Sequence, residues 1–202
     1  MLDNLSNQTI YKQQLHDVID CLATAIEVKD EYTHGHSGRV ADMSCDIASA
    51  MGLKDRYLDY VHMAAHLHDI GKIGISETVL NKKGKLRSNE LAQVQMHSEY
   101  GYRILSKSPA LRPIAKIVLH HHERWDGKGY PCGLKEKEIP LGSRMIAVAD
   151  SIDAMTSQRP YREALSWDFC MEEIGRNSGI MYDPYVVEIV QNLYHSWLQM
   201  AS

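Results

Sequence analysis

Histidine stands out in this sequence, because the chain of 202 residues contains eleven of them. Most lie in the middle of the chain, where His68 directly precedes Asp69. A neutral imidazole and a neighbouring carboxylate can bind one cation, and the second carboxylate oxygen can bridge to another. Most His-Asp pairs in proteins only cap a helix or pack in a core. The pair therefore indicates metal chemistry only if further ligands accompany it.

Such ligands are present at positions that helical spacing turns inward. The apolar periodicity around His97 and His121 places both side chains on buried helix faces. Burying several imidazoles and carboxylates without partners costs several kcal/mol each, whereas a shared metal centre satisfies them together. Histidine and aspartate without thiolate favour iron, manganese, zinc or cobalt. The candidate ligands are His36, His68, Asp69, His97, His121, His122 and Asp150.

The elements that must position these ligands are helices. Apolar stripes predict helices over about 9–29, from Ser37 to Gly52, around 58–67, from an N-cap at Ser88 to Leu105, and after Pro113. Three more are predicted over about 141–157, 167–176 and 184–199, while residues 123–140 hold too many glycines and prolines for a helix. Period-two strand patterns are not convincing anywhere. The sequence therefore predicts an all-α, compact multi-helix bundle with a metal centre between helices and a long Gly/Pro-rich loop.

Composition narrows the class of protein further. The net charge of −4 and the absence of a basic block argue against a long nucleic acid as partner. No apolar run approaches the roughly 18 residues that a membrane span needs, and the first residues lack a signal-peptide pattern. Four scattered cysteines without a CxxC pair are typical of a reducing compartment. We therefore expect a cytoplasmic protein without a membrane span.

The motifs also follow one another in a recognisable order. They are residues 32–37, 68–74, His97, and residues 121–131, 149–154 and 157–162. The block that ends in Gly129-Tyr130-Pro131 is a long signature with no position missing. Over about residues 24–186 the chain resembles the HD-GYP domain, a bacterial subfamily of the HD metal-dependent phosphohydrolases.

This resemblance implies an all-helical domain that holds two, sometimes three, iron or manganese ions and hydrolyses cyclic di-GMP to pGpG and in some cases GMP. Carried over, the metal ligands are the seven residues named above, with Asp69 as a bridge between the ions. One ion would take His36, His68, Asp69 and Asp150, and the other Asp69, His97, His121 and His122. Members with a third ion carry a glutamate where this chain has Tyr32, so we expect two ions.

Five residues are predicted to act on the substrate. The resemblance makes Lys72 the active-site lysine, which holds the phosphate or assists the leaving oxygen, so that Asp69 and Lys72 are the catalytic candidates. It also places Arg159 and Arg162 on cyclic di-GMP. Asp153 is expected to orient a ligand or accept from guanine, and Tyr130 to stack on a base or shape the pocket. Without the resemblance, the arginines are more simply a solvated surface pair. The remaining histidines, among them His16, His62 and His66, receive no role.

The sequence leaves open the role of the N-terminal helix and the choice between alternative functions. Residues 1–23 are predicted to be a helical lead-in or linker and residues 24–202 the catalytic domain. The lead-in is compatible with a relay from an upstream sensory domain, a homodimer contact, or the edge of a longer chain. The function has two alternatives: a phosphodiesterase for another cyclic dinucleotide such as cyclic GMP-AMP, and a non-catalytic cyclic dinucleotide receptor or module that binds signalling partner proteins.

Overall fold

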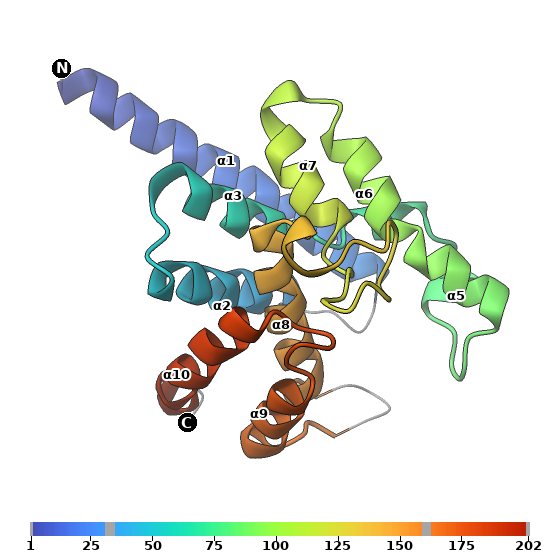
Figure 1. Cartoon of the computed structure of the whole chain (residues 1–202). Helices are drawn as coiled ribbons and strands as arrows, with labels where there is room; N and C mark the ends of the chain where they lie inside the picture. The colour runs from blue at the N-terminus through green and yellow to red at the C-terminus, as the bar shows by residue number, and fades with distance from the viewer. Residues whose placement is uncertain (1, 31–34, 159–162, 201–202) are drawn as a thin grey trace.

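The computed structural model describes residues 2–30, 35–158 and 163–200, and side chains from residue 13 to residue 199 of these ranges. Within them the chain is helical and contains no β-strand, so the all-α prediction is confirmed (Figure 1). None of the described helices is both long and apolar enough to cross a membrane. The helices are α1 (Leu2–Lys29), α2 (His36–Ala50), α3 (Asp55–His66), α4 (Glu77–Leu80), α5 (Ser88–Gln95), α6 (His97–Leu105), α7 (Arg112–Leu119), α8 (Leu141–Thr156), α9 (Trp167–Arg176) and α10 (Pro184–Met200), with short 3₁₀ turns η1 (Ile70–Gly74), η2 (Pro109–Leu111) and η3 (Glu136–Glu138).

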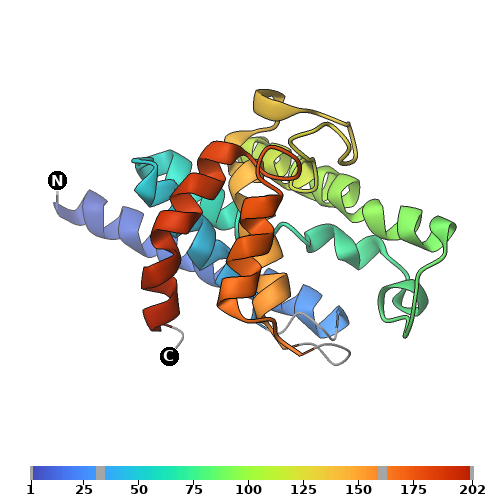
Figure 2. The ribbon, with the colours of Figure 1, turned by 60° about the horizontal axis from the view of Figure 1, so that its bottom comes forward.

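The hydrophobic core lies where α2, α3, α7 and α8 pack together. Helix α8 supplies a run of fully buried apolar side chains, including Met145, Ile146 and Ile152, and α2 contributes Val40 and Ile47. Helices α9 and α10 cover the side of this core formed by α8 and α2 (Figure 2). The stripes predicted for α2 and α7 are thus buried faces, and they hold the ends of these helices in place. In the helix predicted over about 9–29 the stripe is buried only in part, because Leu15, Val18 and Leu22 are exposed.

Among the side chains that the structure describes, helix α1 packs on the domain through its second half. Ile19, Ala23 and Ile26 are buried, and this half contacts α2, α3 and η1. The first half projects away from the body of the molecule (Figures 1 and 2). The helix runs unbroken through residue 23, and the division of the chain at that position stays a prediction.

One predicted helix proves to be two. The segment from Ser88 to Leu105 is divided at Met96, and Arg87 rather than Ser88 occupies the N-cap position of α5. The helix divides because two side chains donate hydrogen bonds to backbone carbonyls of α5. Nδ1 of His97 donates to the carbonyl oxygen of Val94 (2.7 Å), and the Ser98 hydroxyl donates to that of Gln95 (3.1 Å). Side-chain bonds of this kind compete with the helical backbone pattern.

Gly71 allows η1 to pass directly over the start of α6. A Cβ atom at this position would lie 1.8 Å from the carbonyl oxygen of His97 and 2.5 Å from the nitrogen of Gly101. Backbone atoms cannot rotate away from a clash as the end of a flexible side chain can. We therefore expect Gly71→Ala to lower the free energy of unfolding by about 3 kcal/mol or more. Gly38→Ala in α2 is the matched control, since its Cβ would meet nothing within 4 Å. Urea denaturation compares the two, and equal stabilities would contradict the close approach.

Candidate metal centre

The predicted ligands come together where several helices begin or end. His36 is the first residue of α2 and His97 the first residue of α6, while His68 and Asp69 link α3 to η1. His121 and His122 follow α7, and Asp150 lies in the middle of α8. Residues far apart in the sequence therefore face one centre because the core fixes these helix ends around it.

Two groups of potential ligand atoms form this centre. In one, His36, His68 and Asp69 are all buried and offer ligand atoms within 4.8 Å of one another. In the other, His97 and His121 are buried and His122 is partly buried, and their ligand atoms also lie within 4.8 Å of one another. This grouping is the one expected from the sequence for two neighbouring ions, and Asp150 joins the first group, with its Oδ1 3.3 Å from Nε2 of His36.

Asp69 lies between the two groups. Its Oδ2 is 3.5 Å from Nε2 of His68, and its Oδ1 is 3.5 Å from Nε2 of His97. Each carboxylate oxygen thus faces a histidine of a different group. A carboxylate placed in this way can bind one ion with each oxygen.

The histidine rings are oriented by hydrogen bonds on the side away from the centre. In His68, His97 and His121, Nδ1 donates to the carbonyl three residues earlier at 2.6 to 2.7 Å. Nδ1 of His36 instead lies 2.6 Å from Oδ2 of Asp153. Fixing Nδ1 leaves Nε2 to face the centre, which is how ligating histidines are commonly held.

The protonation states also suit a metal centre. Burial lowers the pKa of His121 well below its ordinary value and that of His122 to about 3, which keeps both imidazoles in the neutral form that binds metals. Burial opposes ionisation of Asp69 and Asp150, but the Lys72 ammonium holds the pKa of Asp69 well below its usual range, and the hydrogen bond with His36 lowers the pKa of Asp150. Neutral imidazoles beside ionised carboxylates form a donor set that fits divalent iron or manganese.

Unlike His121 and His122, His36 has a pKa above its ordinary value. Burial alone would lower its pKa, but hydrogen bonds with Asp150 and Asp153 raise it to about 10. The metal-free protein therefore carries a proton on His36 at pH 8, which Nε2 must lose to bind an ion. We expect metal loading at pH 8 to release about one proton per chain and to weaken as the pH falls. Calorimetry in buffers of different ionisation enthalpy measures this release; loading without proton release would contradict the assignment of His36.

A cavity of about 380 Å³ opens beside the centre. His36, Asp69, His97, His122 and Asp150 line it together with Lys72 and Tyr130. The Tyr130 ring lies 4.8 Å from the ring of His122, so the Gly-rich loop forms one wall of the cavity. Five of the seven candidate ligands and two of the predicted substrate-binding residues thus line one cavity.

Lys72 is held by two carboxylates. Its Nζ lies 2.6 Å from Oδ2 of Asp69 and 2.7 Å from Oδ2 of Asp30, the residue that directly follows α1. Burial opposes its charge, but the two carboxylates raise its pKa above the ordinary value, so it stays cationic. Asp30 was not found from the sequence, because it belongs to no motif and its spacing to Lys72 carries no pattern.

Of the three other predicted substrate-binding residues, the structure describes only Asp153, which is not among the residues that line the cavity. Asp153 is 2% exposed and bonded to His36 and to Arg39, a second residue that sequence reasoning missed. This places Asp153 behind a metal ligand. Arg159 and Arg162 lie outside the described residues, as does Tyr32, on which the expected number of ions depended.

The fold and the donor set define an all-helical domain built around a cluster of histidine and aspartate side chains that could hold metal ions. A family model described as HD domain matches residues 20–186. The chain belongs to the HD domain family, and its resemblance to HD-GYP domains is confirmed.

Named relatives agree with this family. The chain is 46% identical over 182 residues to a protein of Thermotoga maritima named cyclic di-GMP phosphodiesterase, covering 89% of this chain and 50% of the relative. It is 35% identical over 190 residues to the 3'3'-cGAMP-specific phosphodiesterase 2 of Vibrio cholerae, covering 93% and 36%. The chain thus spans half or less of the length of these relatives.

A solved structure supports the fold. The crystal structure of a cyclic GMP-AMP specific phosphodiesterase from Vibrio cholerae matches with a TM-score of 0.67 at 19% identity, covering 88% of this chain and 48% of that one. At this identity the likeness concerns the arrangement of helices.

Proposed function

We propose that the chain is a metal-dependent phosphodiesterase that hydrolyses cyclic di-GMP to pGpG, with GMP as a further product to be tested. The observation that carries this proposal is Asp69, whose two oxygens face histidines of two groups, both at 3.5 Å, beside a cavity of about 380 Å³. The names of the relatives supply the substrate class.

We further propose that the centre binds two ions, iron or manganese, through His36, His68, Asp69, His97, His121, His122 and Asp150. When bound, such a pair supplies an acidified water and neutralises charge on the phosphate. Asp69 would contribute a ligand to both ion sites and so fix their spacing. The buried side chains of His68 and His121 lie behind the centre, and the cavity on its other side gives the substrate an approach.

Lys72 is proposed to hold a phosphate oxygen or to stabilise the leaving oxygen. Its side chain is 15% exposed, lines the cavity and stays cationic between Asp30 and Asp69. A fixed cation needs no reorganisation when negative charge develops on an oxygen. Tyr130 is proposed to stack on a guanine base across the cavity, and Arg159 and Arg162 stay predicted phosphate contacts.

Asp153 is proposed to position His36 rather than to contact guanine. Its bond to Nδ1 of His36 is 2.6 Å long and its side chain is buried, so substrate has no direct access to it. We expect Asp153→Asn to weaken metal binding about 10-fold to 100-fold and to lower kcat, with little change in KM. Metal titration and kinetics separate the roles: a raised KM with unchanged metal affinity would support the guanine contact instead.

The choice of substrate is tested by comparing cyclic di-GMP with 3'3'-cyclic GMP-AMP at equal concentrations. Relatives with either activity in their names match this chain, and the one that is 46% identical is named for cyclic di-GMP. We expect a higher kcat/KM for cyclic di-GMP. A higher value for cyclic GMP-AMP would reassign the substrate, and tight binding without product would favour the receptor alternative.

The cellular setting stays a set of predictions. Because the chain spans half or less of these relatives, an upstream sensory domain, signalling partners and a homodimer are proposals about the whole protein. The cytoplasmic location predicted from the sequence is likewise a proposal.

A further inference from the structure

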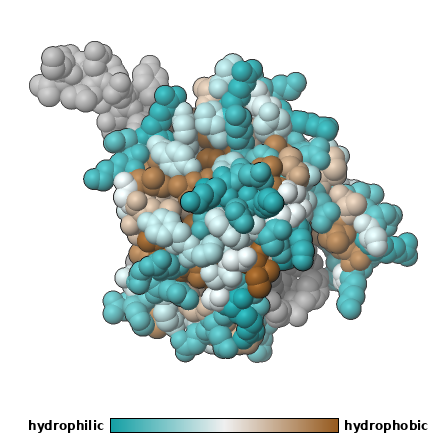
Figure 3. All heavy atoms as spheres, viewed as in Figure 1, coloured by the Kyte–Doolittle hydropathy of each residue, from teal (hydrophilic) through white to brown (hydrophobic). Residues whose placement is uncertain are grey.

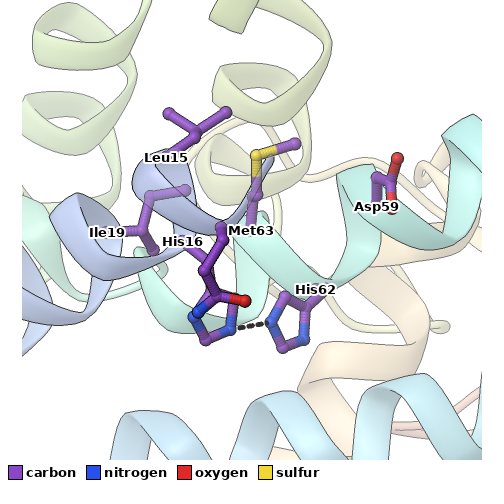
Figure 4. A pocket seen from close by; sticks show the side chains of 7 residues that line it. Leu15, His16, Ile19, Asp59, His62 and Met63 are labelled. Atoms are coloured by element: carbon purple, nitrogen blue, oxygen red, sulfur yellow. Dashed lines mark hydrogen bonds between the residues drawn. The ribbon is translucent and has the colours of Figure 1, made fainter. Parts of the chain in front are cut away.

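A second group of histidines lies between α1 and α3, outside the centre described above (Figure 4). We call it the α1–α3 cluster and define it as His16, Asp20, His62 and His66. The proposed hydrolysis uses none of these side chains. A concentration of imidazoles at the junction of two helices therefore needs its own explanation.

The spacing in each helix places the side chains in pairs. His16 and Asp20 are four residues apart on α1, and His62 and His66 are four residues apart on α3, so each pair occupies one helix face. The two faces meet. Nε2 of His16 lies 2.7 Å from Nε2 of His62, and Nδ1 of His66 lies 3.2 Å from Oδ1 of Asp20.

The ligand atoms converge on one point. The three histidines each offer a nitrogen, and these atoms lie within 4.8 Å of one another. In a tetrahedral zinc site with Zn–N bonds of about 2.0–2.1 Å, ligand nitrogens are separated by roughly 3.3 Å. Nε2 of His16 and Nε2 of His62, now 2.7 Å apart, would have to separate to that spacing. The Asp20 carboxylate lies beside the histidines, with Oδ2 3.0 Å from Nδ1 of His16 and Oδ1 3.2 Å from Nδ1 of His66, and we take it as the fourth ligand.

Two further observations favour a ligand over simple packing. Oδ1 of Asp20 is shielded from solvent and, in the described part of the chain, accepts no hydrogen bond of proper geometry. In addition, Sγ of Cys45 lies 3.3 Å from Nδ1 of His62, which fixes that ring with Nε2 toward His16. Among the described residues, Oδ1 of Asp20 has only the contact with Nδ1 of His66 at 3.2 Å, which is not a hydrogen bond, and a cation would complete this arrangement.

An ion can reach this position from solvent. A hollow of about 310 Å³ is lined by His16, Ile19, His62 and Met63, and the two imidazoles lie side by side at its edge (Figure 4). The cluster is half-exposed at His16 and buried at His66. It therefore combines a closed inner side with an open entrance.

We propose that the α1–α3 cluster binds one Zn²⁺ ion through His16, Asp20, His62 and His66. Three imidazoles and one carboxylate suit zinc in both donor type and number. The ion joins the lead-in helix to α3, the helix that continues directly into His68 and Asp69. It thereby fixes α1 on the domain at a point where the apolar contact is limited to Ile19, Ala23 and Ile26.

The test counts zinc ions in the full chain by equilibrium dialysis with elemental analysis. His62→Gln and His16→Ala are each expected to bind one Zn²⁺ fewer per chain than the wild type, because each removes one ligand. His195→Ala is the matched control, since that histidine is exposed on α10, and it is expected to bind as the wild type does. The centre at Asp69 is unchanged in all three, so the difference reports the cluster.

Hydrogen exchange of the wild type gives a second readout that needs no variant. With manganese already bound at the Asp69 centre, added Zn²⁺ is expected to slow amide exchange in residues 13–20 at least several-fold. Unchanged exchange, or wild-type stoichiometry in either variant, would overturn the proposal. Loss of an ion in His62→Gln alone would also overturn it, because the ion would then not bridge to α1.

Discussion

Replacing Asp69 with alanine is expected to abolish hydrolysis of cyclic di-GMP, with turnover at least about 10³-fold below the wild type. Asp69 faces His68 with one oxygen and His97 with the other, so its removal takes a ligand from both proposed ions at once. The variant should also purify with less metal at both positions. Chromatography of the products and elemental analysis of the protein measure the two effects.

The loss should not be a consequence of unfolding. Lys72, which pairs with Asp69, keeps its ion pair with Asp30 in the variant. Asp69→Asn retains the shape and serves as a second variant, and Asp168→Ala on α9 removes a carboxylate far from the centre as a control. Full turnover in Asp69→Ala, or loss of only one ion, would show that Asp69 does not bridge.

Replacing Lys72 with methionine is expected to lower turnover by about 10²-fold to 10³-fold while the metal content stays as in the wild type. Lys72 contributes no metal ligand, but its cationic Nζ lies at the cavity between Asp30 and Asp69. The two variants therefore lose activity for different reasons: Asp69→Ala loses metal, whereas Lys72→Met keeps it. Steady-state kinetics with parallel metal analysis distinguish these outcomes.

Structural damage can be separated from loss of chemistry in the lysine variant. Lys72→Met leaves Asp30 buried without this cation, which lowers stability. Adding Asp30→Asn removes that carboxylate charge, so the double variant should regain stability without regaining turnover. Lys82→Met, which breaks an ion pair with Glu90, is the control away from the cavity. Turnover restored in the double variant would show that Lys72 acts only on stability.

The sequence predicts the helices and two of the ligand candidates for the same physical reason. Apolar residues at helical spacing define the buried faces, and the structure turns His97 and His121 inward on them. Met96, where the predicted helix divides, carries no such signal. The division depends on hydrogen bonds of the His97 and Ser98 side chains to the preceding carbonyls.

Residues that act through other residues are harder to predict. Asp30 holds Lys72 across 42 positions of sequence, and Arg39 reaches Asp153 across 114. Pairs that distant depend on how the helices pack, which no local pattern encodes. His16 and His62 received no role from the sequence for the same reason, since their proximity follows from the docking of α1 on α3.

The measurement that tests the central claim most directly is product analysis after metal removal and return. The protein is purified without oxygen, chelated, reloaded with manganese, and incubated with cyclic di-GMP while products are followed by chromatography. The account predicts that pGpG forms in the reloaded protein and not in the chelated one. Intact cyclic di-GMP after hours with the centre fully loaded would contradict it.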